Sequence, residues 1–235
     1  FINKNINKID LAPIVFNSDA IVHLSANPGV QTSIDNPALD LQENLLSTFK
    51  LIESIREIGD FTKKIIFSSS AAPLAGNDCM PLDESYPTRP LSPYGASKAS
   101  SEAYLQAYSN VYNLKSLILR FSNIYGPGSI LKGSVVANMI KSAIDKSQIN
   151  IFGDGTQTRD FVFIEELVNI IIYGIDGFSY SSKEPVHVCS GMPTSINTLA
   201  NMIKDELTTF GLKKISINHL EPLRGDAKQN YSSKK

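Results

Sequence analysis

Lys63-Lys-Ile-Ile-Phe-Ser68 and Leu114-Lys-Ser-Leu-Ile-Leu-Arg-Phe121 are two short, mostly apolar runs that are typical of buried strands. Between them, residues 94–112 carry apolar side chains at spacings of three and four, which predicts a helix. A strand, a helix and a second apolar strand in this order favour a parallel sheet with helices on both faces. We therefore expect an α/β, doubly wound fold.

The same alternation continues along most of the chain. No internal repeat and no low-complexity linker interrupts it. Further strands are expected at residues 19–25, 149–152, 185–189 and 215–219, and further helices at 45–58, 135–144, 165–175 and 195–207.

Composition excludes several classes of protein. The 235 residues are 42% hydrophobic and 19% charged, with a net charge of −1, so we expect a packed globular core and no nucleic-acid partner. No apolar run approaches the roughly 20 residues of a membrane span, which predicts no membrane partner. The two cysteines and three histidines fit no metal-ligand spacing, so no metal is expected, and a cytoplasmic location is the natural expectation.

Polar or small residues follow several of the predicted strands directly. These segments are Leu24–Pro28, Ser68–Ser70, Phe121–Tyr125 and the loop after Phe152. In a doubly wound sheet, ligands bind beyond the carboxyl ends of the strands, so we expect these segments to form a site. For the serine triplet alone, a turn with a helix cap is an equally good interpretation.

Tyr94 and Lys98 stand four residues apart in Ser92-Pro-Tyr-Gly-Ala-Ser-Lys98, so a helix places their side chains on one face. An ammonium near a phenol favours the phenolate and lowers the pKa of the tyrosine from its usual value of about 10. Such a phenolate is a general base for a substrate hydroxyl. The spacing alone also fits a half-buried tyrosine beside a solvated lysine.

An ordered set of segments carries a family resemblance. It comprises His23–Ala26, Ser33–Pro37 with Asn44, Phe67–Ala72 with Pro93–Lys98, Leu119–Pro127, Ile151–Phe161, and Arg224–Asp226 with Tyr231–Lys234. The set resembles the extended short-chain dehydrogenase/reductase family in its NAD-dependent sugar-nucleotide epimerase/dehydratase branch, and it is most similar to UDP-hexose 4-epimerases. The resemblance implies a Rossmann-like sheet, NAD as cofactor and a UDP-sugar as substrate.

The resemblance also implies a mechanism that uses Ser70, Tyr94 and Lys98. Tyr94 takes the proton of the sugar 4-hydroxyl, Ser70 helps the proton pass, and hydride leaves C4 for NAD⁺. The 4-keto sugar then takes hydride back on its other face, which epimerises a UDP-hexose at C4. The implied NAD-binding residues are Asn5, Ile6, Leu24, Ser25, Ala26, Asn44, Ser68, Tyr94, Lys98 and Ser122. The implied substrate-binding residues are Ser69, Ser70, Asn123, Val135, Phe152, Arg159 and Arg224.

Two of these substrate residues have a second interpretation. The planar guanidinium of Arg159 suits a diphosphate, but a surface salt bridge with Asp160 or Glu165 is the alternative. Phe152 is expected to flank the uracil ring or to pack in a core.

The resemblance further predicts how the chain is organised. Residues 1–126 would form an NAD-binding Rossmann domain that includes a strand at 115–122, and residues 127–235 would mainly bind substrate, with about 156–190 returning to the Rossmann sheet. Phe1–Ile6 resembles the third strand of the family. The glycine-rich Gly-x-x-Gly-x-x-Gly loop is absent from the sequence. We therefore expect a Rossmann sheet without its first strands, as in an internal fragment that is inactive alone.

Related functions stay open at this point. Family dehydratases and decarboxylases place an acidic residue after the serines, whereas no Asp or Glu lies between Ser68 and Gly76 here, which favours epimerisation. A non-catalytic dinucleotide-binding protein is the alternative from another class, although such proteins typically lose the tyrosine or the lysine. The resemblance also implies a homodimer through helices 41–58 and 94–112.

Overall fold

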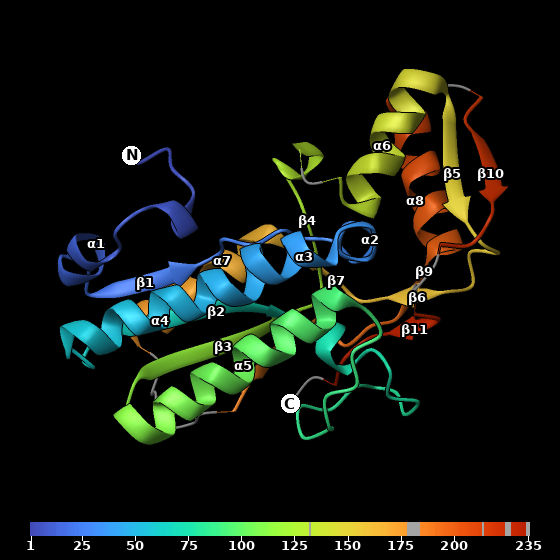
Figure 1. Ribbon diagram of the computed structural model, residues 1–235. Coiled ribbons are helices and arrows are strands. Elements are labelled where there is room, and N and C mark those ends of the chain that lie inside the picture. The colour runs from blue at the N-terminus through green and yellow to red at the C-terminus, as the bar shows by residue number, and fades with distance from the viewer. Residues whose placement is uncertain (132, 178–183, 213, 224–226, 234–235) are drawn as a thin grey trace.

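The computed structural model of the protein describes residues 1–131, 133–177, 184–212, 214–223 and 227–233. Its largest described sheet has four parallel strands in the order β1-β2-β3-β8 (Figure 1). This order confirms the predicted α/β fold of Rossmann type, with β1 at one edge of the described sheet. The strands are β1 (Ala20–His23), β2 (Lys64–Ser70), β3 (Lys115–Phe121) and β8 (Val186–Val188).

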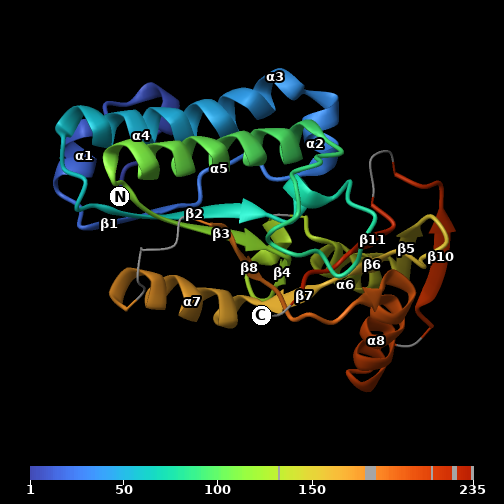
Figure 2. The same ribbon diagram turned by 90° about the horizontal axis from the view of Figure 1, so that it is seen from below.

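Helices cover both faces of this sheet. α4 (Ser47–Ile58) and α5 (Pro93–Tyr112) lie side by side on one face, and α7 (Ile164–Asp176) lies on the other (Figure 2). The short helix α1 (Ala12–Phe16) packs against α4. The helices expected at 94–112 and 165–175 are therefore present, each within one residue of its predicted ends.

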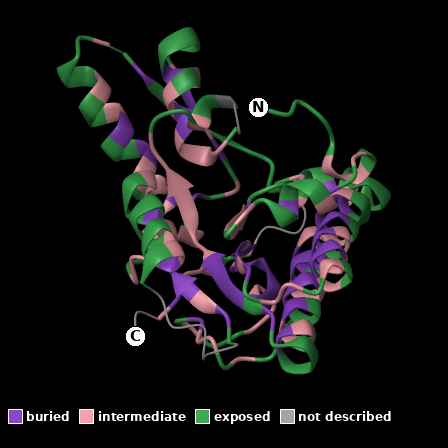
Figure 3. Cartoon of the chain, turned by 90° about the vertical axis from the view of Figure 1, so that its left-hand side faces the viewer, coloured by how far each residue is buried: buried purple, intermediate pink, exposed green. Residues whose placement is uncertain are grey.

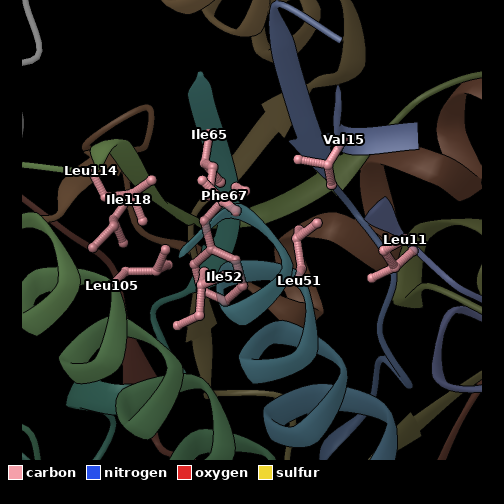
Figure 4. Close-up of a cluster of buried hydrophobic side chains, with 10 residues drawn as sticks. Leu11, Val15, Leu51, Ile52, Ile65, Phe67, Leu105, Leu114 and Ile118 are labelled. Carbon is pink, nitrogen blue, oxygen red and sulfur yellow. The ribbon is translucent and has the colours of Figure 1, made fainter. Parts of the chain in front are cut away.

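Apolar side chains between β2, β3 and the pair α4 and α5 form the main core (Figure 4). Phe67 and Ile65 point to this side of β2, and Ile52 of α4 and Leu105 of α5 meet them there. Each of these side chains is fully buried, which contributes about 1.5–3 kcal/mol apiece to folding. Burial is concentrated in the sheet and on the inner sides of the helices (Figure 3).

A second, smaller unit of structure lies beside the sheet. It consists of two helices, two parallel strands and their own apolar cluster around Ile149 and Ala200. Its elements are α6 (Val135–Lys146), β5 (Gln148–Phe152), α8 (Ile196–Thr209) and β10 (Ser216–Leu220).

Short strands connect the two parts. β4 (Asn123–Tyr125) pairs with β7 (Phe161–Phe163), and β6 (Thr158–Arg159) pairs with both β9 (Thr194–Ser195) and β11 (Gln229–Asn230). After β7 the chain passes through α7 to β8, which is a strand of the large sheet.

The helix that ends with α4 begins earlier and has an unusual centre. After α2 (Val30–Asp35) and the non-helical Asn36, α3 (Pro37–Asp40), a π-helix at Leu41–Leu46 and α4 follow one another without a break. The helix expected at 45–58 is therefore longer than its apolar periodicity indicated. A π-helix is rare and often accompanies a functional site.

The strand expected at Phe1–Ile6 is wrong. Phe1–Asn5 contains no strand, and Ile6–Lys8 is a 3-10 helix, in which Asn5 caps the backbone N–H of Asn7 at 2.8 Å. The reason is the local hydrogen bond of this asparagine, which competes with strand pairing. Two further 3-10 turns are Ala72–Leu74 and Ser129–Leu131. Within the described ranges, no helix has the length and apolar character needed to cross a bilayer.

Candidate active site

A cavity of about 450 Å³ lies at the carboxyl ends of β2 and β3. Its walls come from the large sheet and from the smaller unit, because α6 and β5 also contribute residues. The sequence-predicted residues that line it are Ser69, Ser70, Tyr94, Ser122, Asn123, Val135, Phe152 and Arg159. Segments that are far apart in the sequence therefore meet at one site, as the rule for parallel sheets predicts.

Tyr94 reaches this cavity because α5 begins beside the end of β2. Ser92 caps the helix by accepting a hydrogen bond from Gly95 N at 3.1 Å, and Pro93 occupies the first turn. Gly95 permits this close approach, since a Cβ there would lie 2.8 Å from the carbonyl oxygen of Ala72. Tyr94 is half-buried, and its side chain and that of Ser70 line the same cavity.

Lys98 lies one turn further along α5 and is only 2% exposed. Its Nζ donates a hydrogen bond to the carbonyl oxygen of Ser68 at 2.8 Å. The same Nζ lies 4.8 Å from the centroid of the Phe67 ring and 6.0 Å from that of Tyr94. The prediction that Tyr94 and Lys98 share one face of a helix is confirmed, and the alternative of a solvated lysine is wrong.

The expected low pKa of Tyr94 is wrong for the chain alone. Burial raises the pKa of Tyr94 to about 12, and the negative charge of Asp40 adds to this effect, while the hydroxyl of Ser70 opposes it. Burial also lowers the pKa of Lys98 to about 8, against the opposing charges of Asp40 and Glu102. Loss of water disfavours both charged forms, and this cost outweighs the attraction that the spacing suggested.

Ser69 was expected to bind substrate, but its hydroxyl makes a hydrogen bond within the protein. Its hydroxyl donates a short hydrogen bond to the carboxylate of Glu102. Glu102 also forms a salt bridge with Arg120, with Nη2 and Oε2 2.8 Å apart, and both side chains are under 5% exposed. Arg120 Nη1 donates to the carbonyl oxygen of Glu84 at 3.3 Å. A buried ionic network therefore joins α5, β2 and β3 next to Ser70, the serine that is expected to be catalytic.

Asn44, an expected NAD-binding residue, holds the loop after β1. Its Oδ1 accepts from Asn27 N at 2.7 Å, and its Nδ2 donates to Asn27 O at 3.2 Å. The same Nδ2 donates to Asp40 Oδ1 at 2.6 Å. The amide thus acts on the segment Leu24–Pro28, which contains the expected cofactor contacts Leu24, Ser25 and Ala26.

Two other expected cofactor residues make contacts within the chain. Ser68 Oγ donates to the carbonyl oxygen of His23 at 3.0 Å. The side-chain amide of Asn5 donates to the carboxylate of Glu43 at 3.2 Å and 3.3 Å. The first contact ties β2 to the end of β1, and the second ties the N-terminal segment with Ile6 to the π-helix.

The residues expected to bind substrate differ in what they contact at this end of the cavity. Asn123 Nδ2 donates to the carbonyl oxygen of Asp160 at 3.3 Å, and Arg159 Nη1 donates to that of Thr158 at 2.7 Å. The carboxylate of Asp160 binds the N–H groups of Ser190 and Gly191 at 2.8 Å and 2.9 Å. Phe152 is exposed at the cavity rather than packed in the core. Arg224 lies outside the described residues.

Sequence reasoning missed three buried charged residues beside the site. Glu102 continues the stripe of Tyr94 and Lys98 by another four residues, so the helical spacing could have found it. Asp40 and Arg120 carried no such signal, because their burial depends on helix packing and on the sheet register that places Arg120 opposite Ser69.

A serine at the end of a parallel strand, with a tyrosine and a lysine one turn apart on the next helix, is the arrangement of the short-chain dehydrogenase/reductase class. Comparison with protein families agrees. Residues 4–188 match the NAD dependent epimerase/dehydratase family, and the chain belongs to this family.

Two curated relatives illustrate the similarity. The chain is 36% identical to a putative UDP-glucose 4-epimerase of Methanocaldococcus jannaschii, over 88% of this chain and 68% of that protein. It is 32% identical to a UDP-glucose 4-epimerase of Mycolicibacterium smegmatis, over 86% of this chain and 65% of that protein. The chain therefore spans about two thirds of the length of these relatives.

A solved structure shows the same fold. The UDP-glucuronic acid 4-epimerase from Bacillus cereus, in complex with UDP-glucuronic acid and NAD, superposes with a TM-score of 0.89. It is 26% identical, and the match covers 99% of this chain and 72% of that one.

Proposed function

We propose that the protein is an NAD-dependent epimerase that inverts C4 of a UDP-hexose through a 4-keto intermediate. The observation that supports this best is the meeting of Ser70 and Tyr94 at one cavity, with the buried Lys98 ammonium 6.0 Å from the centroid of the Tyr94 ring. The relatives named UDP-glucose 4-epimerase support the same reaction.

The residues present fit the nicotinamide end of NAD. A lysine ammonium has three donors, and Lys98 gives one of them to Ser68 O, which leaves others for the ribose hydroxyls. Ser122 and the loop that Asn44 holds lie at the neighbouring strand ends. When bound, NAD supplies the acceptor for the hydrogen at C4 and then its donor, so it turns over without net oxidation.

Tyr94 is the proposed base, and its surroundings disfavour the loss of its proton. With a pKa of about 12 in the chain alone, its hydroxyl is protonated at neutral pH. Positive charge brought near the hydroxyl favours the phenolate, and the buried Lys98 already supplies one such charge. Ser70 lines the cavity beside Tyr94 and is the proposed group that passes the proton between Tyr94 and the substrate oxygen.

The rest of the cavity suits a nucleotide sugar. Arg159 offers a guanidinium for the diphosphate, Phe152 an exposed ring for the uracil, and Asn123 and Val135 complete the wall. No acidic residue stands in Ser68–Gly76 to promote the further proton removal of a dehydratase. Which hexose is preferred is a separate property, and neutral glucose-type and glucuronate-type sugars are both substrates to assay.

The test is the substitution Tyr94→Phe, with Tyr104→Phe as its matched control. Tyr104 lies on the same helix, partly exposed and packed on Phe49 with ring centroids 5.4 Å apart. Loss of the base should lower turnover of UDP-glucose and UDP-galactose by about 10²–10⁴-fold and leave NAD binding in place. The control should keep full turnover.

Binding and turnover are measured separately, by NAD fluorescence titration and by a coupled UDP-sugar assay. Turnover of Tyr94→Phe equal to that of the control contradicts the proposed base. In a protein that also carries the expected glycine-rich loop, NAD binding without conversion of any UDP-sugar favours the non-catalytic dinucleotide-binding function instead.

A further inference from the structure

Asp40 is a buried negative charge that the proposed mechanism does not use. It is the last residue of α3, it is 1% exposed, and the π-helix begins at the next residue. In the part of the chain that the structure describes, no salt bridge includes its carboxylate. Burial of a carboxylate without a direct cationic partner is costly, so a role elsewhere in the structure is needed to explain it.

The hydrogen bond from Asn44 gives the first part of that role. Asp40 Oδ1 accepts from Asn44 Nδ2 at 2.6 Å, and a carboxylate can only accept. This contact therefore fixes which end of the Asn44 amide faces Asp40. The amide oxygen is then left for Asn27 N, at 2.7 Å, as the loop after β1 requires.

Helix packing gives the second part. α3 and the π-helix lie directly against α5, the helix that carries Tyr94 and Lys98 (Figure 2). The charge of Asp40 acts on both of these groups, since it raises the pKa of Lys98 and that of Tyr94. A buried anion on α3 thus lies near enough to the buried Lys98 of α5 for its charge to act on that ammonium.

The other titratable groups around Lys98 are bound to other partners or are neutral. Glu102, on α5 itself, is bound to Arg120 and Ser69. His23, on β1, is hydrogen-bonded to Thr48 at 3.0 Å, and burial lowers its pKa to about 4, so it is neutral at neutral pH. Asp40 is therefore the carboxylate near Lys98 whose charge is not offset by a direct salt bridge.

We infer that Asp40 is a positioning residue of the active site, whose buried carboxylate both orients the Asn44 amide that holds the loop Leu24–Pro28 and serves as the counter-charge of the Lys98 ammonium. It touches neither substrate nor cofactor. It acts through Asn44 on the cofactor loop, and its charge acts on both Lys98 and the proposed base Tyr94. α3 therefore influences the acid–base groups Tyr94 and Lys98, although it lies outside the cavity wall.

The direct test is the titration of Lys98 by NMR in protein labelled with ¹³C at the lysine ε-carbon. Lys98→Arg identifies the signal by removing it. In the unsubstituted chain the pKa should be about 8, and in Asp40→Asn it should fall by about one unit, because the stabilising charge is gone. Asp35→Asn, an exposed carboxylate of α2, is the matched control and should leave the value unchanged.

A Lys98 pKa in Asp40→Asn equal to that in Asp35→Asn overturns the inference. If Asp40→Asn does not fold, the unsubstituted chain still decides. Two coupled groups each report the titration of the other, so the ¹³Cγ signal of Asp40 should shift at the pH at which Lys98 loses its proton. Absence of that step overturns the inference as well.

The catalytic meaning of Asp40 rests on the proposed function, but its coupling to Lys98 does not. The NMR titration needs no cofactor and no substrate, so a failed epimerase assay and a failed coupling are separate results. In an active protein, Asp40→Asn should move the whole pH profile of kcat/KM to lower pH, because the pKa values of Tyr94 and Lys98 both fall. A merely loosened structure would lower the profile without moving it.

Discussion

The substitution Glu102→Leu tests how the sheet supports the site. It removes the carboxylate from a salt bridge whose atoms Nη2 and Oε2 lie 2.8 Å apart, and it leaves the Arg120 guanidinium buried at 4% exposure. The hydroxyl of Ser69 loses its acceptor at the same time. Removal of one partner from a buried pair costs about 3–5 kcal/mol, because the remaining charge has lost both water and its counter-ion.

This cost is large against the stability of an ordinary domain, which is about 5–15 kcal/mol. With an m-value of about 3 kcal/mol per molar urea, it corresponds to a fall in the unfolding midpoint of about 1–1.7 M. The assay is urea unfolding followed by circular dichroism. Arg56→Met, which breaks the exposed pair of Arg56 with Glu53, is the control and should move the midpoint far less.

The double substitution Glu102→Leu/Arg120→Met separates charge from packing. It removes both ions, so much of the lost stability should return, as expected when a buried pair is replaced by apolar side chains. A midpoint for Glu102→Leu within the error of the Arg56→Met control would refute the reasoning. A double variant less stable than Glu102→Leu would do so too, because the uncompensated charge would then not be the cause.

Three further predictions concern other parts of the molecule. Burial lowers the pKa of His23 from 6.5 to about 4, so the unfolded state binds a proton on this histidine first as pH falls. His23 therefore lowers the free energy of unfolding progressively from pH 6.5 down to pH 4, by about 2 kcal/mol at pH 5. The difference in urea unfolding between the unsubstituted chain and His23→Gln should show this loss. Gly95→Ala places a Cβ 2.8 Å from the oxygen of Ala72, so it should displace Tyr94 and lower kcat by about 10–100-fold in steady-state assays, and an unchanged kcat would contradict the close approach. The homodimer proposed through α4 and α5 should dissociate in the double variant Phe49→Glu/Tyr104→Glu, which changes exposed aromatic side chains of both helices; equal sedimentation of variant and unsubstituted chain would argue against this interface.

Much of the fold was predictable because its strands are short, apolar and separated by helical spacings. The strands at β2 and β3 lie within two residues of their predicted ends. The failure at Phe1–Ile6 has a local cause, since Asn5 caps a 3-10 turn and also binds Glu43 of the π-helix. A side-chain hydrogen bond of this kind leaves no apolar pattern in the sequence.

The residues that meet at the cavity were more predictable than their electrostatics. The rule for strand ends placed Ser70 and Asn123 at one cavity, and α5, which begins beside the end of β2, brings Tyr94 to it. The spacing of Tyr94 and Lys98 predicted a lowered tyrosine pKa, whereas burial raises it. Desolvation depends on what the neighbouring helices cover, and a linear sequence does not state that.

The π-helix at Leu41–Leu46 makes the site sensitive to the number of residues in one helix. Each residue of an α-helix turns the chain by about 100°, so a single-codon deletion between Asp40 and Asn44 would rotate the start of the helix by that angle relative to its end. Asp40 would then leave the side that faces α5, while Asn44 stayed against its loop. Length variation that surface loops accept freely would here separate the Asp40 carboxylate from Lys98, so we expect the number of residues in this helix to be constrained.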